Sequence, residues 1–196
     1  ENVTSINRSD HDFEITDEKN LEKIASKTCG PFRLIINATG VLDTSGNGPE
    51  KTINSIRKTS MIDIMSINAV GPALLLKFFS GKLDRDAPSI FVNLSARVGS
   101  IEDNKMGGWI SYRASKAALN QIIKTASIEI QRKNKNAICI GLHPGTVKTQ
   151  FTKNYHKRVE TISAALSVSM LISVLEKIKV SDNGKVFAYD GSVIPW

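Results

Sequence analysis

Short apolar runs alternate with longer amphipathic segments along the chain. The apolar runs have the length of strands and read NVTSI, FRLIINA, SIFVNLS, AICIGLH and GKVFAYDG. The amphipathic segments repeat apolar residues every three or four positions, at EKNLEKIASK, 59–80, 111–133 and 161–178. Strands without internal alternation are buried on both faces, which is typical of a parallel sheet covered by helices on both sides. The pattern predicts one α/β domain with a doubly wound parallel sheet in three layers, α/β/α.

Composition and charge narrow the function classes. The chain has 196 residues, of which 41% are hydrophobic and 23% are charged, as in an ordinary globular domain. We find no signal peptide in the first residues and no run of bilayer-spanning length, and we expect a cytoplasmic protein. Cys29 and Cys139 have no metal-ligand spacing, so no metal site is expected.

The net charge of +7 has two interpretations. It indicates either a lysine-rich solvated surface or attraction to an anionic ligand. The lysines are scattered and no basic stripe is interleaved with aromatic residues, so we expect neither nucleic acid nor a membrane as partner.

Polar or glycine-bearing residues follow the expected strands. They are Arg8, the stretch Asn37–Gly40, Ser95, and Pro144 with Gly145. In a doubly wound fold, ligands bind beyond the carboxyl ends of the strands. Taken singly, each of these residues is better explained as an ordinary turn.

Tyr112 and Lys116 lie four residues apart in an expected helix and therefore share one face. An ammonium beside a phenol favours the phenolate, and we expect it to lower the pKa of Tyr112 toward the working pH of a general acid. The pair alone is more typical of an exposed helical stripe. Two further residues favour the chemical interpretation, namely Ser95 at a strand end and Asn68 inside an apolar helix. Asn68 is either a paired polar kink or an anchor for a water molecule.

Five motifs in the same order resemble those of the short-chain dehydrogenase/reductase family. They are INATG, NAVG, VNLSARVGS, YRASK and HPGTVKT, and the match runs nearly end to end. The C-factor-like branch is the most similar, because of ARVGSIEDNKMGGWISYRASKAALN and the C-terminal YDGSVIPW. The resemblance implies a Rossmann-like fold and reduction of a carbonyl, or oxidation of an alcohol, with a nicotinamide cofactor.

The resemblance also implies roles for single residues. Tyr112 gives a proton to the carbonyl oxygen, and Lys116 lowers the pKa of Tyr112 and holds the nicotinamide ribose. Ser95 hydrogen-bonds the substrate oxygen, and Asn68 anchors a water that relays protons to Lys116.

The same resemblance implies which residues contact the cofactor. An acidic residue after the second strand of this fold suits NAD and a basic one suits the 2′-phosphate of NADP, so Arg8 and Ser9 favour NADP(H), while Asp10 keeps NAD(H) open. The implied cofactor residues are Arg8, Ser9, Glu14, Ile15, Asn37, Ala38, Thr39, Gly40, Tyr112, Lys116, Pro144, Gly145, Val147 and Thr149.

The sequence departs from the family pattern in three places. The smallest departure is Glu14, which stands where the family commonly has an aspartate that contacts adenine, and its longer carboxylate can still make that contact. The glycine-rich turn that opens the family fold is absent, and we expect that the sequence begins after a first βα unit whose loss exposes strand edges. The family has two adjacent serines where this chain has Ser95 and Ala96, and simple register puts alanine at the catalytic position. Ser100 is therefore a second candidate for that role.

Two functions remain open at this stage. One is an active carbonyl reductase or alcohol dehydrogenase that acts on a small molecule, and the other is a non-catalytic relative with a binding or signalling role. By analogy with the family, a homodimer or homotetramer is expected to form through helices 59–80 and 108–131. The stretches 43–51 and 146–162 are expected to border the pocket as mobile loops, and Trp109 and Phe151 either line a cleft or pack inside.

Overall fold

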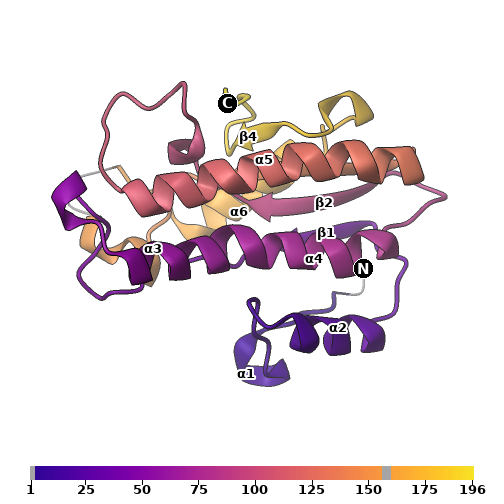
Figure 1. Ribbon diagram of the computed structural model, residues 1–196. Coiled ribbons are helices and arrows are strands. Elements are labelled where there is room, and N and C mark those ends of the chain that lie inside the picture. Colours follow the sequence, from indigo (N-terminus) through magenta and orange to yellow (C-terminus); the bar gives the residue numbers. More distant parts are fainter. Residues whose placement is uncertain (1–2, 156–159) are drawn as a thin grey trace.

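The protein folds around a parallel four-stranded sheet (Figure 1). The structure is a computed structural model, and it describes residues 3–155 and 160–196. The strands are β1 (Leu34–Asn37), β2 (Ser89–Leu94), β3 (Ala137–His143) and β4 (Val186–Ala188), and they lie side by side in chain order. Ile36 pairs with Val92, and Val92 pairs with Ile140.

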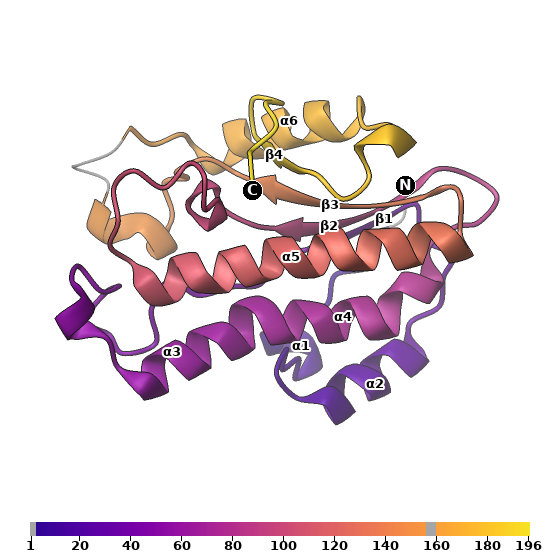
Figure 2. The same cartoon turned by 45° about the horizontal axis from the view of Figure 1, so that its top comes forward.

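Helices cover both faces of this sheet, which confirms the three-layer α/β/α fold (Figure 2). The helices are α1 (Arg8–His11), α2 (Glu18–Lys27), α3 (Lys58–Met65), α4 (Gly71–Phe79), α5 (Ile110–Lys133) and α6 (Ala164–Leu175). The helices α3, α4 and α5 lie on one side of the sheet and α6 on the other, while α2 packs against α4. The expected helices at 18–27 and 111–133 are thus confirmed, and the one expected at 161–178 forms over the shorter range Ala164–Leu175.

The core has two halves because strand side chains alternate between the faces of the sheet. On β3, Ala137 and Cys139 pack in the cluster that contains Ile123 of α5. The intervening Ile138 and Ile140 belong to a second cluster, which contains residues of α6. Both faces of the sheet are apolar, which explains why the strands show no hydrophobic alternation in the sequence.

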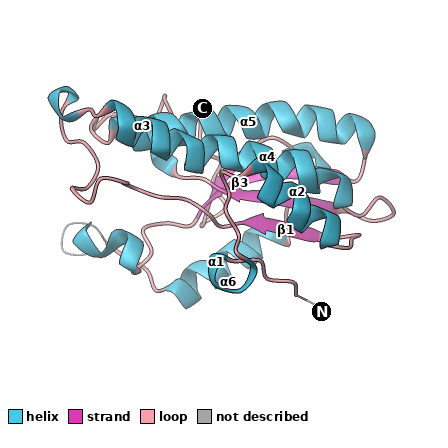
Figure 3. Ribbon diagram, turned by 60° about the horizontal axis from the view of Figure 1, so that its bottom comes forward, coloured by secondary structure: helices cyan, strands magenta, loops and turns pink. Residues whose placement is uncertain are grey.

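The expected strand at NVTSI is not formed. Residues 3–7 run as irregular chain, and Val3 is 90% exposed. A β-strand needs a neighbour for its backbone hydrogen bonds, and among the described residues no strand pairs with the outer edge of β1 (Figure 3). Leu34 and Ile36 of β1 are accordingly 43% and 52% exposed.

The expected helix at 59–80 forms as α3 and α4, joined by the π-helical turn Ser66–Val70. The continuous helical span Lys58–Lys82 is long and apolar enough to cross a membrane, which corrects the expectation that no run reaches that length. Length and composition are weak evidence by themselves, since the core helix of a soluble protein passes the same test. Ile64, Leu75 and Leu76 on this span are buried inside the protein.

Candidate active site

The carboxyl ends of the parallel strands lie at the edge of the sheet where α5 begins (Figure 1). Tyr112 and Lys116 stand in the first two turns of α5. At the end of β1, the Asn37 amide nitrogen donates to Asn93 Oδ1 at 2.9 Å, and the Thr39 hydroxyl donates to Asn37 Oδ1 at 2.7 Å. The strand end is therefore held by side-chain hydrogen bonds next to the tyrosine helix.

Lys116 is buried beside Tyr112. Its ammonium donates a hydrogen bond to the Leu94 carbonyl at 2.9 Å and lies 5.9 Å from the centre of the Tyr112 ring. Only 4% of Lys116 and 7% of Tyr112 is exposed. Burial penalises the charged form of each group, so it lowers the pKa of Lys116 to about 8 and raises the pKa of Tyr112 above its ordinary value.

The expectation that the pKa of Tyr112 is lowered overall is thus wrong, because burial raises it. Desolvation of the phenol is the leading cause of its shift. At neutral pH Tyr112 is consequently protonated, and Lys116, below its pKa of about 8, is mostly cationic.

Asn68 lies in the π-helical turn with its side chain fully paired. Its amide oxygen accepts from the Val41 backbone N–H at 2.8 Å, and its amide nitrogen donates to the Val41 carbonyl at 2.8 Å and to Ser115 Oγ at 3.0 Å. The backbone of Asn68 is different, because Pro72, four residues later, has no N–H to donate to the Asn68 carbonyl. The side chain is therefore structural, and the residue four positions later offers the Asn68 carbonyl no N–H.

Gly40 brings the strand end and both helices together. A Cβ atom added at this glycine would lie 3.2 Å from Asn68 Oδ1 and 3.6 Å from Lys116 Nζ. The Gly40 backbone therefore approaches Asn68 more closely than most residues would allow, and it lies within ordinary contact distance of Lys116.

Two aromatic rings flank Tyr112. The rings of Trp109 and Phe151 both lie 6.3 Å from the Tyr112 ring, measured between centroids. Both rings pack beside the site tyrosine, and Phe151 is also 44% exposed. The result is an apolar surrounding for the phenol.

The candidate serines both make other hydrogen bonds. Ser95 donates to Asn120 Oδ1 at 2.6 Å, and Ser100 donates to the Trp196 carbonyl at 3.3 Å and accepts from the Asp103 N–H at 3.0 Å. Neither hydroxyl is hydrogen-bonded to Tyr112 in the described part of the chain. The structure brings Tyr112, Lys116, Asn68 and Gly40 together, but it does not direct a serine to the phenol.

Comparison with known proteins decides the family. A family model described as short chain dehydrogenase matches residues 10–160. The chain belongs to the short-chain dehydrogenase family.

Two relatives differ in how much of their own length this chain covers. The C-signal protein of Myxococcus xanthus is 28% identical over 177 residues, which cover 90% of this chain and all of that protein. An uncharacterised oxidoreductase of Saccharomyces cerevisiae is 36% identical over 146 residues, or 69% of this chain and 56% of that protein.

The chain therefore spans little more than half the length of the yeast relative. An NADPH-bound carbonyl reductase from chicken fatty liver is similar in structure, with a TM-score of 0.78 and 27% identity over 93% of this chain and 75% of that one. The carbonyl reductase Sniffer of Drosophila melanogaster has a TM-score of 0.79 over 94% of this chain and 76% of its own, and at 23% identity it shows the fold alone.

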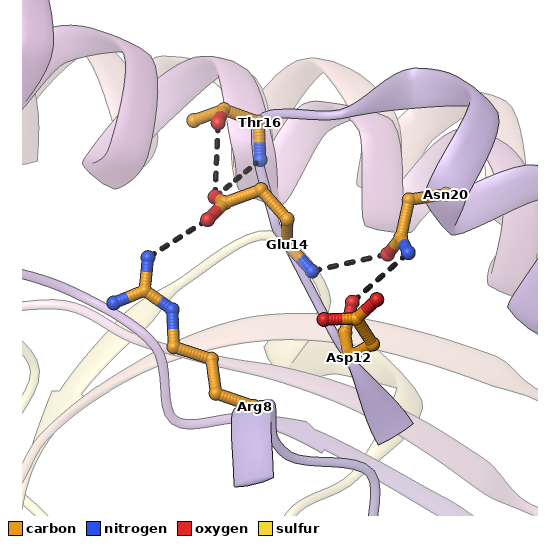
Figure 4. Close-up of polar contacts among 5 residues, drawn as sticks. All are labelled: Arg8, Asp12, Glu14, Thr16 and Asn20. Atoms are coloured by element: carbon orange, nitrogen blue, oxygen red, sulfur yellow. Dashed lines mark hydrogen bonds and ion pairs between the residues drawn. The ribbon is translucent and has the colours of Figure 1, made fainter. Parts of the chain in front are cut away.

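The family resemblance predicted cofactor contacts near the start of this short-chain dehydrogenase chain, where the structure shows an ion pair (Figure 4). Arg8 donates to Glu14 Oε2 at 2.8 Å, and Thr16 donates to Glu14 Oε1 from its N–H and its hydroxyl. The Arg8 hydrogen bond is the main reason why the pKa of Glu14 is lowered. The two residues expected to contact a dinucleotide thus bind each other, and both side chains remain accessible.

The remaining expected cofactor residues of the family pattern differ in accessibility. Ser9, Ala38 and Thr149 are exposed, and Pro144, Gly145 and Val147 are partly buried. Ile15 is a core residue, since only 5% of it is exposed and its side chain fills the space beside Gly71. Ile15 therefore contributes packing, and the side chain of Asp10 lies outside the described residues.

Sequence reasoning missed two residues next to the site. Glu50 lies in the loop-like stretch 43–51, yet its carboxylate binds Ser111 at the start of α5. His143 ends β3 with its Nδ1 atom buried and unpaired among the described residues, and burial lowers its pKa to about 4. Glu50 belongs to no local motif, and His143 opens the HPGTVKT motif but was given no role from the sequence.

Proposed function

We propose that this chain is an NADP-dependent carbonyl reductase of the short-chain dehydrogenase family, with Tyr112 as general acid. The observation that carries the proposal is the buried pair of Tyr112 and Lys116 at the sheet edge, next to Gly40 and Asn68. A phenol and an ammonium buried at the ligand-binding edge of an α/β sheet are costly for stability, which is typical of a functional site.

The residues around this edge suit a nicotinamide dinucleotide. The close approach of the Gly40 backbone to Lys116 leaves a side-chain-free surface beside the ammonium. When bound, NADP(H) supplies the hydride that adds to the carbonyl carbon of the substrate. Lys116 then holds the ribose hydroxyls, and Arg8 binds the 2′-phosphate once it leaves Glu14.

The proton comes from the protein. Because burial raises the pKa of Tyr112, the phenol is protonated at neutral pH and donates to the carbonyl oxygen as that oxygen gains negative charge. The tyrosinate that forms is stabilised by the Lys116 ammonium and recovers its proton through Lys116 and a water on the Asn68 carbonyl. The protonated resting state of Tyr112 provides the acid that reduction requires.

A serine contact with the substrate oxygen requires a rearrangement. Ser95 reaches the substrate only if its hydroxyl leaves Asn120, and Ser100 only if it leaves the Trp196 carbonyl. Ser95 stands directly after β2, at the sheet edge, and we keep it as the proposed donor ahead of Ser100.

Turnover by Tyr112→Phe tests the proposal. NADPH oxidation is followed by absorbance with a panel of aldehydes and ketones, and NADPH binding is followed by fluorescence. We expect the variant to bind NADPH like the wild type and to lose at least about a hundredfold in kcat, since a positioned general acid contributes that much. Tyr189→Phe serves as the matched control and keeps its activity. Unchanged turnover in Tyr112→Phe refutes the mechanism.

A non-catalytic signalling role is the second candidate, and the resemblance to C-signal supports it. NADPH titration of the wild type separates the two functions. Absence of any dinucleotide binding favours the signalling role, whereas binding with turnover favours the reductase.

We also propose that the chain acts as one domain, in the cytoplasm, as a homodimer or homotetramer. Helices α3 to α5 are the proposed interface, and Ile62, Val70 and Ile128 on this helical layer are about half exposed, which supports it. Sedimentation of the wild type against Ile62→Glu tests the assembly, and a monomeric wild type refutes it.

A further inference from the structure

Helix α5 begins without a cap from its own sequence. The residue at the N-cap position is Trp109, whose side chain makes no capping hydrogen bond. Gly107, Gly108 and Trp109 all have positive φ angles, of 65°, 67° and 53°. A tryptophan in this left-handed region is unusual and is held there by surrounding contacts. The start of the helix that carries Tyr112 therefore depends on other parts of the chain.

Glu50 supplies the missing cap from 61 residues away in the sequence. Its carboxylate accepts hydrogen bonds from the Ser111 backbone N–H at 3.3 Å and from the Ser111 hydroxyl. Its backbone carbonyl accepts from the Trp109 N–H at 2.5 Å. Only 9% of Glu50 is exposed and Ser111 is fully buried, so water does not replace these bonds easily. A negative charge at a helix N-terminus is also favoured by the helix dipole.

The loop that carries Glu50 is held by its own hydrogen bonds. The Asp43 carboxylate accepts from the Ser45 N–H and hydroxyl at 3.1 and 2.8 Å, and from the Gly48 N–H at 3.0 Å. Thr44 and Ser60 share a hydrogen bond of 3.0 Å, which ties the loop to α3. The carboxylate is thus presented to α5 by a braced segment.

We propose that Glu50 is a positioning residue for Tyr112. It acts through Ser111, the residue directly before Tyr112, and fixes the first turn of α5 and with it the direction of the phenol. The catalytic part of this inference rests on the proposed function, and its structural part does not. The loop that follows the carboxyl end of β1 would thereby set the position of Tyr112, the proposed proton donor, on α5.

The test compares Glu50→Ala, Glu50→Gln and Asp17→Ala in the full chain. Glu50→Gln keeps an acceptor for Ser111, whereas Glu50→Ala leaves both Ser111 donors unpaired. Asp17 is the matched control, because its carboxylate caps α2 by accepting from the Asn20 N–H at 3.0 Å, and α2 carries none of the proposed catalytic residues.

We expect Glu50→Ala to lower kcat by about 10- to 100-fold, as small displacements of a catalytic group do, with the KM for NADPH unchanged. Glu50→Gln recovers most of this loss, and Asp17→Ala leaves kcat unchanged at a temperature where all variants are folded. Equal kcat in Glu50→Ala and wild type, or the same loss in Asp17→Ala, overturns the proposal.

Hydrogen exchange over residues 109–116 separates this inference from the proposed function. Glu50→Ala should speed exchange of these amides by at least about tenfold, because it frees the first turn, and Asp17→Ala should not. If the wild type reduces no carbonyl, the proposed function fails, and exchange alone decides whether Glu50 holds the turn. Unchanged exchange in Glu50→Ala overturns the inference whatever the activity.

Discussion

Replacing the buried lysine by methionine, Lys116→Met, should make the protein more stable at neutral pH while it abolishes activity. Burial lowers the pKa of Lys116 from its ordinary value of 10.5 to about 8. Each tenfold change in the protonation equilibrium is worth about 1.4 kcal/mol, so holding the buried ammonium costs the wild type about 3 kcal/mol at pH 7. Methionine fills similar space without a charge. It leaves the Leu94 carbonyl without its donor, at a cost of about 1 kcal/mol.

The net gain of about 2 kcal/mol should depend on pH in a defined way. Below about pH 8 the lysine is charged in both the folded and the unfolded state, and the full cost is present. Between about 8 and 10.5 the unfolded state binds more protons than the folded state, so the stability of the wild type rises with pH. The Lys116→Met variant does not gain stability in this pH range. The difference in free energy of unfolding between the variant and the wild type should therefore shrink to about zero near pH 10.

Urea unfolding at pH 7 and pH 10 measures this difference, and Lys124→Met serves as the control on the same helix. Lys124 is exposed, so its replacement should change stability little and equally at both pH values. A Lys116→Met variant that is less stable than the wild type at pH 7, or a difference that does not shrink with pH, refutes the reasoning. A stable variant without turnover would show that the charge is kept for function at the expense of stability.

Two further predictions concern the ion pair and a close glycine contact. Glu14→Gln should release Arg8 and strengthen NADPH binding by about two- to fivefold relative to NADH, as expected for an exposed ion pair. Unchanged selectivity, or the same change in the control Glu18→Gln, would contradict this role of Arg8. Gly71→Ala should lower the free energy of unfolding by about 1–3 kcal/mol, because the added Cβ would lie 2.5 Å from Ile15 Cγ1. Gly81→Ala, whose Cβ meets nothing within 4 Å, should have little effect, and equal urea midpoints for the two variants would contradict the packing argument.

The sequence predicts well what depends on local periodicity. The apolar repeat of 111–133 predicted α5, and the four-residue spacing placed Tyr112 and Lys116 on one face. The prediction of a strand at NVTSI was wrong, because a strand requires a neighbouring strand to pair with, and periodicity does not reveal whether one is present. The predicted direction of the pKa shift of Tyr112 was wrong for a similar reason. The spacing indicates the nearby ammonium but not how deeply the phenol is buried.

Three long-range contacts place the site, and two of them start from the segment that follows β1. The segment that follows β1 sends the Val41 backbone to Asn68 and the Glu50 carboxylate to Ser111. The third contact joins Lys116 to the carbonyl end of β2. Residues 41–50 therefore connect the end of β1 to the π-helical turn and to the start of α5. A substitution in this segment should change the geometry of the proton donor without touching any residue of the Tyr-x-x-x-Lys motif.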